Sequence, residues 1–233
     1  MLVYMVSSML EEERRDHIAD LAELFPLIQQ IEAIYPNRIN IPFYSAIKSI
    51  TKSRTGIAIS DGALGCLLSH RRVWSTFLHQ DQFDNCLILE SDSDIVNLKS
   101  LNDLYSYATE KYDIFFWGAF DGRMKLFKST IKQLNDYTFG EPYKNSLYCT
   151  YGYSINKKAA AYLLKKTAQF NYPVDYWKYR LNRKEINIGG ILPNLIITKS
   201  AFTSTIYIQS KTVFNKLFDM IIDFKNYIIT FFN

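Results

Sequence analysis

The sequence predicts an α/β fold, in which helices flank a mostly parallel central sheet and an amphipathic helix ends the chain. Short apolar runs alternate with segments of helical periodicity, which is typical of strand–helix–strand units. One run, residues 86–89, has polar residues on both sides and indicates a central parallel strand. Hydrophobic residues are 48% and aromatic residues 15% of the 233, enough to build a large core and too many for a disordered chain.

The first 60 residues predict two strands and one helix. Residues 2–6 form a short apolar run typical of a buried strand, and residues 31–35 predict a second one that ends at Pro36. Between them, acidic residues 11–13 suit the first turn of a helix, because negative charge stabilises a helix N-terminus. The helical spacing continues through Ile18, Leu21, Leu24 and Phe25. Residues 38–60 favour no single element.

The middle of the chain gives the clearest helix. Ser60 or Asp61 can cap it, and a broad apolar stripe then follows at helical spacing, formed by Leu64, Leu67, Leu68, Val73, Trp74, Phe77 and Leu78. After the strand at 86–89 we expect a helix near residues 98–109. A further buried strand at 114–117 should end at Gly118.

Polar and mixed residues from 121 to 146 predict loops with little regular structure. Beyond them, residues 147–155 predict a strand and residues 157–166 a helix, and residues 186–197 return to strand-like composition. The interpretation is one domain over residues 1–210, followed by a separate helix at 211–233.

The final segment is rich in aromatic and aliphatic residues that charged residues interrupt, so it predicts an amphipathic helix rather than a transmembrane one. Two alternatives remain open for residues 211–233. The helix packs on the domain, or it rests on an anionic membrane surface.

The formal net charge of +4 fits a phosphate-bearing ligand or an anionic membrane, and is too small to suggest a nucleic-acid partner. The three cysteines match no zinc spacing and have apolar neighbours, so we expect buried free thiols in a reducing compartment. Residues 1–6 are too short an apolar stretch for a secretory signal. The expected location is the cytoplasm, and peripheral contact with the inner membrane face is the alternative that the final segment leaves open.

Three acidic residues directly follow the strand at 86–89. Glu90, Asp92 and Asp94 alternate, and in an extended chain such side chains point the same way. Carboxylates that close repel one another, and a divalent cation with all-oxygen ligands, Mg²⁺ or Mn²⁺, removes the repulsion. The alternative is a solvated acidic loop that caps the next helix.

A second cluster lies at the start of the predicted central helix. Gly62 and Gly65 leave room for close approach of another backbone. Ser69, His70 and Arg71 carry donors suited to a diphosphate or to sugar hydroxyls, although a single histidine on a helix is more often structural.

These two clusters carry a resemblance to a known family. The motif Gly65-Cys66-x-Leu68-Ser69-His70, followed by Leu87-Ile88-Leu89-Glu90-x-Asp92, resembles glycosyltransferase family 25, the lipooligosaccharide biosynthesis enzymes. The resemblance covers roughly residues 1–200 and includes Arg14-Arg15, the segment 150–155 and Pro173-Val174-Asp175. Two departures stand out: Ala63 replaces the glutamate of the family, and Ser91 replaces the first aspartate after Glu90.

The resemblance implies a GT-A fold and an inverting transferase that moves a hexose, most often galactose from UDP-galactose, onto a lipid-linked oligosaccharide. It implies Mn²⁺ or Mg²⁺ held by Glu90 and Asp92. Contacts to the nucleotide-sugar donor are expected from Ser7, Arg14, Arg15, Ser69 and His70.

Inversion requires a base that takes the proton of the acceptor hydroxyl. Asp175 is the first candidate, because it follows Pro173 and has aromatic neighbours, Tyr172, Tyr176 and Trp177, on which a sugar face can stack. Asp121 is the second.

A different class of enzyme remains as an alternative. Asp92-Ser93-Asp94 matches the Asp-x-Asp motif of haloacid-dehalogenase phosphatases. Glu90 and Ser91 separate it from the strand, however, and the sequence has no later Asp-Asp pair for Mg²⁺.

Overall fold

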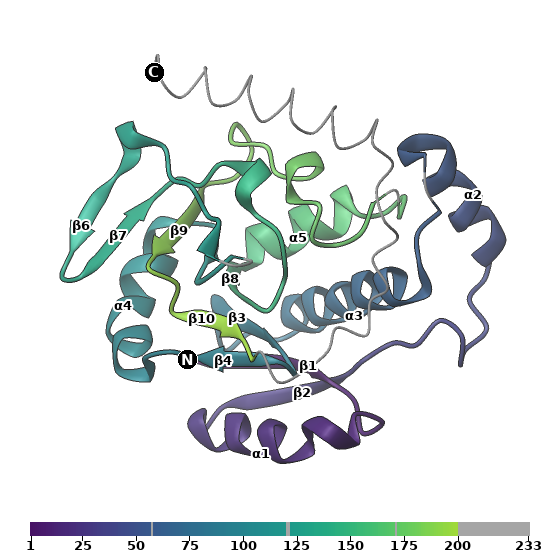
Figure 1. The fold of residues 1–233 in the computed structure, drawn as a ribbon, viewed down its shortest axis with the longest axis horizontal. Coiled ribbons are helices and arrows are strands. Elements are labelled where there is room, and N and C mark those ends of the chain that lie inside the picture. Colours follow the sequence, from purple (N-terminus) through teal and green to yellow (C-terminus); the bar gives the residue numbers. More distant parts are fainter. Residues whose placement is uncertain (57, 120–121, 171, 200–233) are drawn as a thin grey trace.

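The computed structural model describes residues 1–56, 58–119, 122–170 and 172–199. A sheet of eight strands forms its centre, in the order β2-β1-β3-β8-β5-β9-β7-β6, and helices lie against it (Figure 1). The predicted α/β class, with a central sheet flanked by helices, is therefore confirmed. Asp121 and residues 200–233, which include the helix predicted at 211–233, lie outside the described residues.

The helices are α1 (Arg15–Leu24), α2 (Tyr44–Thr55), α3 (Asp61–Leu78), α4 (Leu98–Lys111) and α5 (Lys157–Lys166). The eight sheet strands are β1 (Leu2–Ser7), β2 (Ile28–Glu32), β3 (Asn85–Glu90), β5 (Ile114–Phe116), β6 (Lys132–Leu134), β7 (Tyr137–Gly140), β8 (Gly152–Asn156) and β9 (Ile188–Leu192). A second, two-stranded sheet pairs β4 (Ser93–Ile95) with β10 (Ile196–Thr198).

The central sheet is mixed in direction. β1 runs parallel to both β2 and β3, and β5 runs parallel to β9. β8 lies between β3 and β5 and runs antiparallel to both. The antiparallel register sets Tyr153 of β8 opposite Ile88 of β3, so residues near the start of β8 come to lie beside the carboxyl end of β3.

One prediction about the second half of the chain was wrong. Residues 121–146 contain a regular element that the sequence did not predict, because β6 and β7 form an antiparallel hairpin there that extends the sheet edge. These strands are short and carry polar side chains, so they lack the apolar run by which a central strand is recognised. The signal that the sequence did contain is the Asn135-Asp136 turn, in which Asn135 has φ of 53°.

Several predicted boundaries also shift. The second strand is Ile28–Glu32 rather than 31–35, and the strand predicted at 147–155 begins only at Gly152. The strand-like segment 186–197 divides into β9 and β10, which belong to different sheets. The ends of a strand are set by where it pairs with its neighbours. The sequence of one segment does not reveal its pairing partner, so these boundaries could not be predicted.

The pleat of β3 determines which way its last residue faces. Cys86 and Ile88 pack in the cluster that includes the buried residues of α3 and α5. Leu87 and Leu89 pack on the opposite side, with buried residues of α1 and α4. Because side chains alternate along a strand, Glu90 follows Cys86 and Ile88 and faces α3.

Helix α3 approaches the backbone after β2 very closely. A Cβ atom at Gly65 would lie 2.3 Å from the Ile34 carbonyl oxygen, which only glycine avoids. The Ser69 hydroxyl donates to the Gly65 carbonyl (2.7 Å) and accepts from the Ile34 N–H (2.8 Å). The predicted close approach at this glycine is confirmed, and it places the next turns of α3 beside the end of β3.

All three cysteines are free, as expected, but only Cys86 is buried while Cys66 and Cys149 are half-buried. Within the described residues, no helix combines the length and the apolar character that crossing a bilayer requires.

Candidate active site

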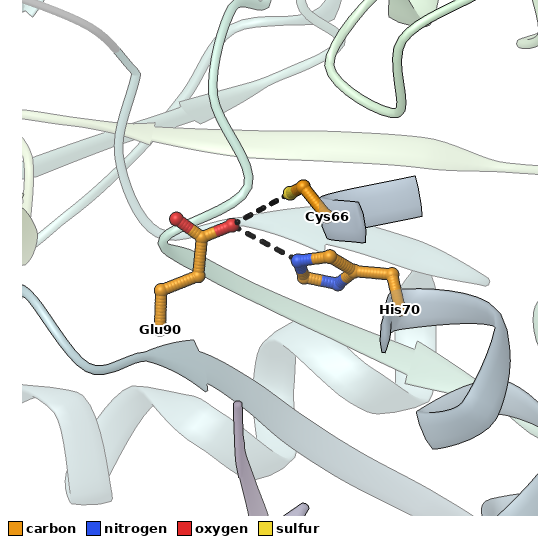
Figure 2. Close-up of side chains that lie close together, drawn as sticks. All are labelled: Cys66, His70 and Glu90. Atoms are coloured by element: carbon orange, nitrogen blue, oxygen red, sulfur yellow. Dashed lines mark hydrogen bonds and ion pairs between the residues drawn. The ribbon is translucent and has the colours of Figure 1, made fainter. Parts of the chain in front are cut away.

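The carboxylate of Glu90 is the centre of a polar cluster at the carboxyl end of β3. Its Oε1 atom accepts hydrogen bonds from His70 Nε2 (2.9 Å), Thr150 Oγ1 (2.5 Å) and Cys66 Sγ (3.5 Å). Cys66 and His70 are four residues apart on α3 and therefore share one face of the helix. Figure 2 shows both side chains directed at this one oxygen, while the second carboxylate oxygen points away from them.

The orientation of His70 is determined by buried partners. Its Nδ1 atom lies 2.8 Å from the Tyr153 hydroxyl, which also accepts a hydrogen bond from Trp74 Nε1 (2.9 Å). In a neutral ring, the nitrogen that faces a carboxylate carries the proton, so Nε2–H donates to Glu90 and the Tyr153 hydroxyl donates to Nδ1. The imidazole is wholly buried, and its hydrogen bond orients the Glu90 carboxylate.

The hydrogen bonds to Glu90 keep its carboxyl ionised. Burial by itself raises the pKa of this group, but the hydrogen bonds from His70, Thr150 and Cys66 outweigh burial. The pKa of Glu90 consequently lies below its ordinary value. An ionised carboxylate with one outward-facing oxygen is suited to binding a cation.

A second polar group gathers around Arg14, which is buried at the end of the short helical turn before α1. Its Nη1 atom donates to Ser91 Oγ (2.7 Å) and lies 3.6 Å from Asp92 Oδ2 and 3.5 Å from Glu11 Oε1. Ser91, the departure from the family motif, therefore uses its hydroxyl to bind Arg14. Arg14 links the β1 end of the sheet to the turn that follows β3.

Asp92 carries an unsatisfied oxygen. Its Oδ1 atom is buried and has no hydrogen-bond partner among the described residues. Burial first, and then the negative charge of Glu90, raise the pKa of Asp92 to about 6, although Arg14 acts in the opposite direction. The carboxyl groups of Glu90 and Asp92 therefore lie within electrostatic range of each other.

Asp175 approaches the same group from the loop between α5 and β9. Burial raises the pKa of its carboxyl, the charge of Glu90 raises it further, and the positive charge of Arg180 opposes both. The fold has therefore brought Asp175 within electrostatic range of Glu90 from a distant part of the chain.

The loop that carries Asp175 is anchored by two buried side chains. Trp177 Nε1 donates to the Cys149 carbonyl (2.9 Å), and its ring packs edge-on against Phe116 and Tyr153. The Arg180 guanidinium donates to the carbonyls of Val174 (3.2 Å) and Tyr172. These contacts hold the backbone on both sides of Asp175.

One expectation about this loop was wrong. Trp177 has no exposed surface, so its ring is not available to stack on a sugar. Tyr172 and Tyr176 remain half-buried, and Tyr172 stacks on Tyr179 with ring centroids 4.2 Å apart.

Glu90, Asp92 and Asp94 do not converge on one point. Within the described residues, the only group of three acidic, histidine or cysteine side chains with ligand atoms inside 4.8 Å is Cys66, His70 and Glu90. The chain turns at Ser91 and Asp92, so the alternation of an extended strand stops after Glu90. Asp94 instead lies in β4, paired with Ile197 of β10.

The remaining predicted donor-binding residues are spread over the same edge of the sheet. Ser7 is buried at the end of β1, and Arg15 is exposed at the start of α1. Ser69 is buried, and its hydroxyl hydrogen-bonds to the protein backbone, donating to the Gly65 carbonyl and accepting from the Ile34 N–H.

Sequence reasoning missed the partners that hold the carboxylates, chiefly Cys66, Thr150 and Tyr153. The four-residue spacing of Cys66 and His70 is a signal that predicts a shared helix face. No local signal identifies Thr150 and Tyr153, because the antiparallel pairing of β8 with β3 places them.

A cavity of about 440 Å³ is lined by Tyr151 and by residues of β10 and the segment before it, among them Asn194 and Thr198. The Tyr151 carbonyl accepts from the Glu90 N–H (3.4 Å), so the cavity wall and the acidic turn share a backbone contact.

This arrangement, with carboxylates and an arginine at the carboxyl ends of the strands of an α/β sheet, is typical of enzymes that bind phosphorylated ligands. The model of glycosyltransferase family 25 (LPS biosynthesis protein) matches residues 1–177, and the chain belongs to this family.

Some solved structures resemble this chain distantly. The apo-form glycosyltransferase GlyE of Streptococcus pneumoniae has 14% identity and a TM-score of 0.38 over 80% of this chain and 44% of its own. The galactosyltransferase LgtC, in complex with donor and acceptor sugar analogs, has 14% identity and a TM-score of 0.37 over 78% of this chain and 66% of its own. Mannose-1-phosphate geranyltransferase from Thermus thermophilus has 10% identity and a TM-score of 0.38 over 83% of this chain and 73% of its own.

This chain therefore spans less than half the length of GlyE and less than two thirds of the length of LgtC. No curated protein matches the sequence significantly.

The raised pKa of Asp92 makes a prediction about stability. An unfolded aspartate loses its proton near pH 3.8, whereas Asp92 in the fold loses it near pH 6. The unfolded state binds fewer protons in this interval, so the free energy of unfolding falls as the pH rises through it. The variant Asp92→Asn carries no charge at this position and therefore does not lose stability in this way. In metal-free buffer it should melt at a higher temperature than wild type above pH 6, and the difference in melting temperature should close toward pH 3.8. A gap that stays constant across this interval in thermal unfolding would contradict the assignment.

Proposed function

We propose that this glycosyltransferase is an inverting, metal-dependent hexosyltransferase that moves galactose from UDP-galactose onto a lipid-linked lipooligosaccharide acceptor. The observation that carries the proposal is the position of Glu90 at the end of β3 and of Asp92 on the turn that follows, with Arg14 beside Asp92. A pyrophosphate is the ligand whose charge matches a bound cation and a buried arginine together. Family membership supports the sugar-transfer chemistry.

The residues present fit a divalent cation of the Mn²⁺ or Mg²⁺ type. Asp92 Oδ1 is buried without a partner among the described residues, and Glu90 directs one carboxylate oxygen away from its hydrogen-bond donors. Oxygen ligands of this kind are the ones that these ions prefer. Glu90 and Asp92 would hold the cation, which when bound supplies Lewis-acid stabilisation of the nucleoside diphosphate leaving group.

Arg14 is the donor-binding residue that the geometry favours. Ser91 orients its guanidinium, which lies near Asp92 on the turn where the diphosphate would bind. A guanidinium offers planar, paired donors that match phosphate oxygens. His70 contributes indirectly, because it orients Glu90 rather than presenting a free donor.

Asp175 is the proposed general base. Its raised pKa brings the carboxyl closer to neutral pH, where a base accepts a proton most effectively. The anchored loop fixes its backbone, so the carboxylate can accept the proton of the acceptor hydroxyl as that oxygen attacks the sugar carbon. Attack from the face opposite the diphosphate inverts the anomeric centre.

The cavity beside β10 is the proposed place for the hexose or for the end of the acceptor. Asn194 and Thr198 offer polar side chains there, next to an apolar wall formed by Leu192 and Pro193. We propose that the enzyme acts in the cytoplasm, at the inner membrane face where a lipid-linked acceptor would be presented.

The phosphatase alternative lacks support from the site. Family membership points to sugar transfer, and Asp92 and Asp94 are separated between a turn and strand β4. Incubation with p-nitrophenyl phosphate should release no nitrophenol above background.

The proposed reaction is tested with the purified chain, UDP-galactose, a lipooligosaccharide acceptor and Mn²⁺. Product should form, stop on addition of EDTA and resume when Mn²⁺ is restored, because the diphosphate leaves without charge compensation in the absence of the cation. Mass spectrometry of the acceptor checks this. UDP-glucose and UDP-N-acetylglucosamine are the comparison donors. Unchanged turnover in EDTA would contradict the proposed metal dependence. Transfer from UDP-glucose or UDP-N-acetylglucosamine but not from UDP-galactose would contradict the proposed donor.

Removing the base should slow the chemistry without weakening donor binding. We expect Asp175→Asn to lower kcat by at least about 100-fold, with the KM for the donor little changed. The comparison variant is Asp81→Asn, an exposed residue before β3, which should retain full activity. If Asp175→Asn kept near-normal kcat, another group would be the base.

Two adjacent arginines give a matched test of donor binding. Arg14→Ala should raise the KM for the donor by about ten- to a hundredfold, since a buried charge-assisted hydrogen bond to the diphosphate is lost. Arg15→Ala, at an exposed position, should change it by less than about fivefold. Thermal unfolding of both variants checks that the fold survives. Equal effects would mean that burial of Arg14 has no bearing on the donor site.

A further inference from the structure

Cys66, His70 and Glu90 form a compact set of three different ligand types. Their Sγ, Nε2 and Oε1 atoms all lie within 4.8 Å of one another. Two of the three come from one face of α3 and the third from the end of β3, so rigid elements hold all of them. Figure 2 shows the thiol and the imidazole converging on the same carboxylate oxygen.

The spacing of these atoms is close to that of a tetrahedral zinc site. Zinc bonds to sulfur, nitrogen and oxygen imply separations between ligand atoms of about 3.3–3.6 Å. The observed separations are 3.5 Å from Cys66 Sγ to Glu90 Oε1 and 2.9 Å from His70 Nε2 to the same oxygen. Small outward shifts of the Cys66 and His70 side chains would therefore make room for the ion.

The surroundings already orient the ligands. The Tyr153 hydroxyl lies against His70 Nδ1 and can accept as well as donate, so it can hold the tautomer that presents an unprotonated Nε2 to a metal. Thr150 donates to Glu90 and steadies the carboxylate. The Glu90 side chain is 24% exposed, which leaves a path for an ion and a position for a water ligand.

We propose that Cys66, His70 and Glu90 form a binding site for a thiophilic divalent cation of the Zn²⁺ type. Mixed sulfur, nitrogen and oxygen ligands favour Zn²⁺ over Mg²⁺ or Mn²⁺, which prefer oxygen alone. The site differs from the proposed Glu90 and Asp92 site in two of its ligands and in the class of ion. It stands on the geometry of this cluster and does not depend on the proposed transfer reaction.

Binding changes the protonation of two ligands. The Cys66 thiol releases its proton to solvent and binds as the thiolate, while the His70 proton moves from Nε2 to Nδ1 through exchange with solvent. Glu90 Oε1 exchanges the hydrogen bonds from Cys66 and His70 for the metal. Occupation would thus take Glu90 away from its resting contacts, so Zn²⁺ should act as an inhibitor of any reaction that needs this carboxylate.

The test uses Co²⁺ as a spectroscopic probe on the full chain, with no nucleotide sugar present. Wild type should bind one Co²⁺ with a thiolate-to-cobalt charge-transfer absorption, and Zn²⁺ should displace it. Cys66→Ser should lose this absorption and bind Zn²⁺ at least about tenfold more weakly, since it lacks a thiolate. The serine hydroxyl still donates to Glu90, so the fold should persist, which thermal unfolding checks.

Cys149→Ser is the matched control, because Cys149 is a half-buried free thiol outside the cluster. It should retain the absorption and the affinity of wild type. Absence of the charge-transfer band in wild type, or its persistence in Cys66→Ser, would overturn the proposal. This experiment measures metal binding in the absence of a sugar donor. A negative result would therefore not bear on the proposed sugar transfer, and a protein that fails to transfer sugar could still bind Zn²⁺ at this site.

Discussion

The buried interaction between His70 and the Glu90 carboxylate supports the whole candidate site. Glu90 ends a central strand in a position where burial alone would favour its neutral form. The hydrogen bonds from His70, Thr150 and Cys66 reverse that tendency, and Tyr153 and Trp74 hold the imidazole in turn. Tyr153 and Trp74 are themselves packed in the core between the sheet and α3, so the charge is held in place by the same packing that stabilises the domain.

Around this fixed carboxylate, the fold collects groups from distant segments. Arg14 and Ser91 join the β1 end of the sheet to the turn after β3, and the anchored loop brings Asp175 from the far half of the chain. Glu90 raises the pKa of both Asp92 and Asp175, so its charge acts on acids from two distant parts of the chain. Such coupled carboxyl groups are characteristic of places where a protein binds charge or moves protons.

Sequence reasoning succeeded where local physics decides the outcome. The α3 helix begins at Asp61 with Ser60 as its cap, and α5 spans Lys157–Lys166 as its composition indicates. It failed at the β6–β7 hairpin, whose short polar strands owe their order to pairing at the sheet edge. It also expected Glu90, Asp92 and Asp94 to converge, because a periodic pattern does not reveal the turn at Ser91 and Asp92.

The sequence by itself determined the fold class, the family motifs and the acidic character of the turn after β3, since these depend on residue type, spacing and periodicity within one segment. Only the tertiary structure decided that Trp177 is an anchor rather than a sugar platform, that Ser69 serves the backbone, and that Cys66 joins His70 on Glu90. These facts depend on which strand lies beside which, and above all on the antiparallel insertion of β8 beside β3. Contacts between distant segments arise from packing, which no single stretch of residues encodes alone.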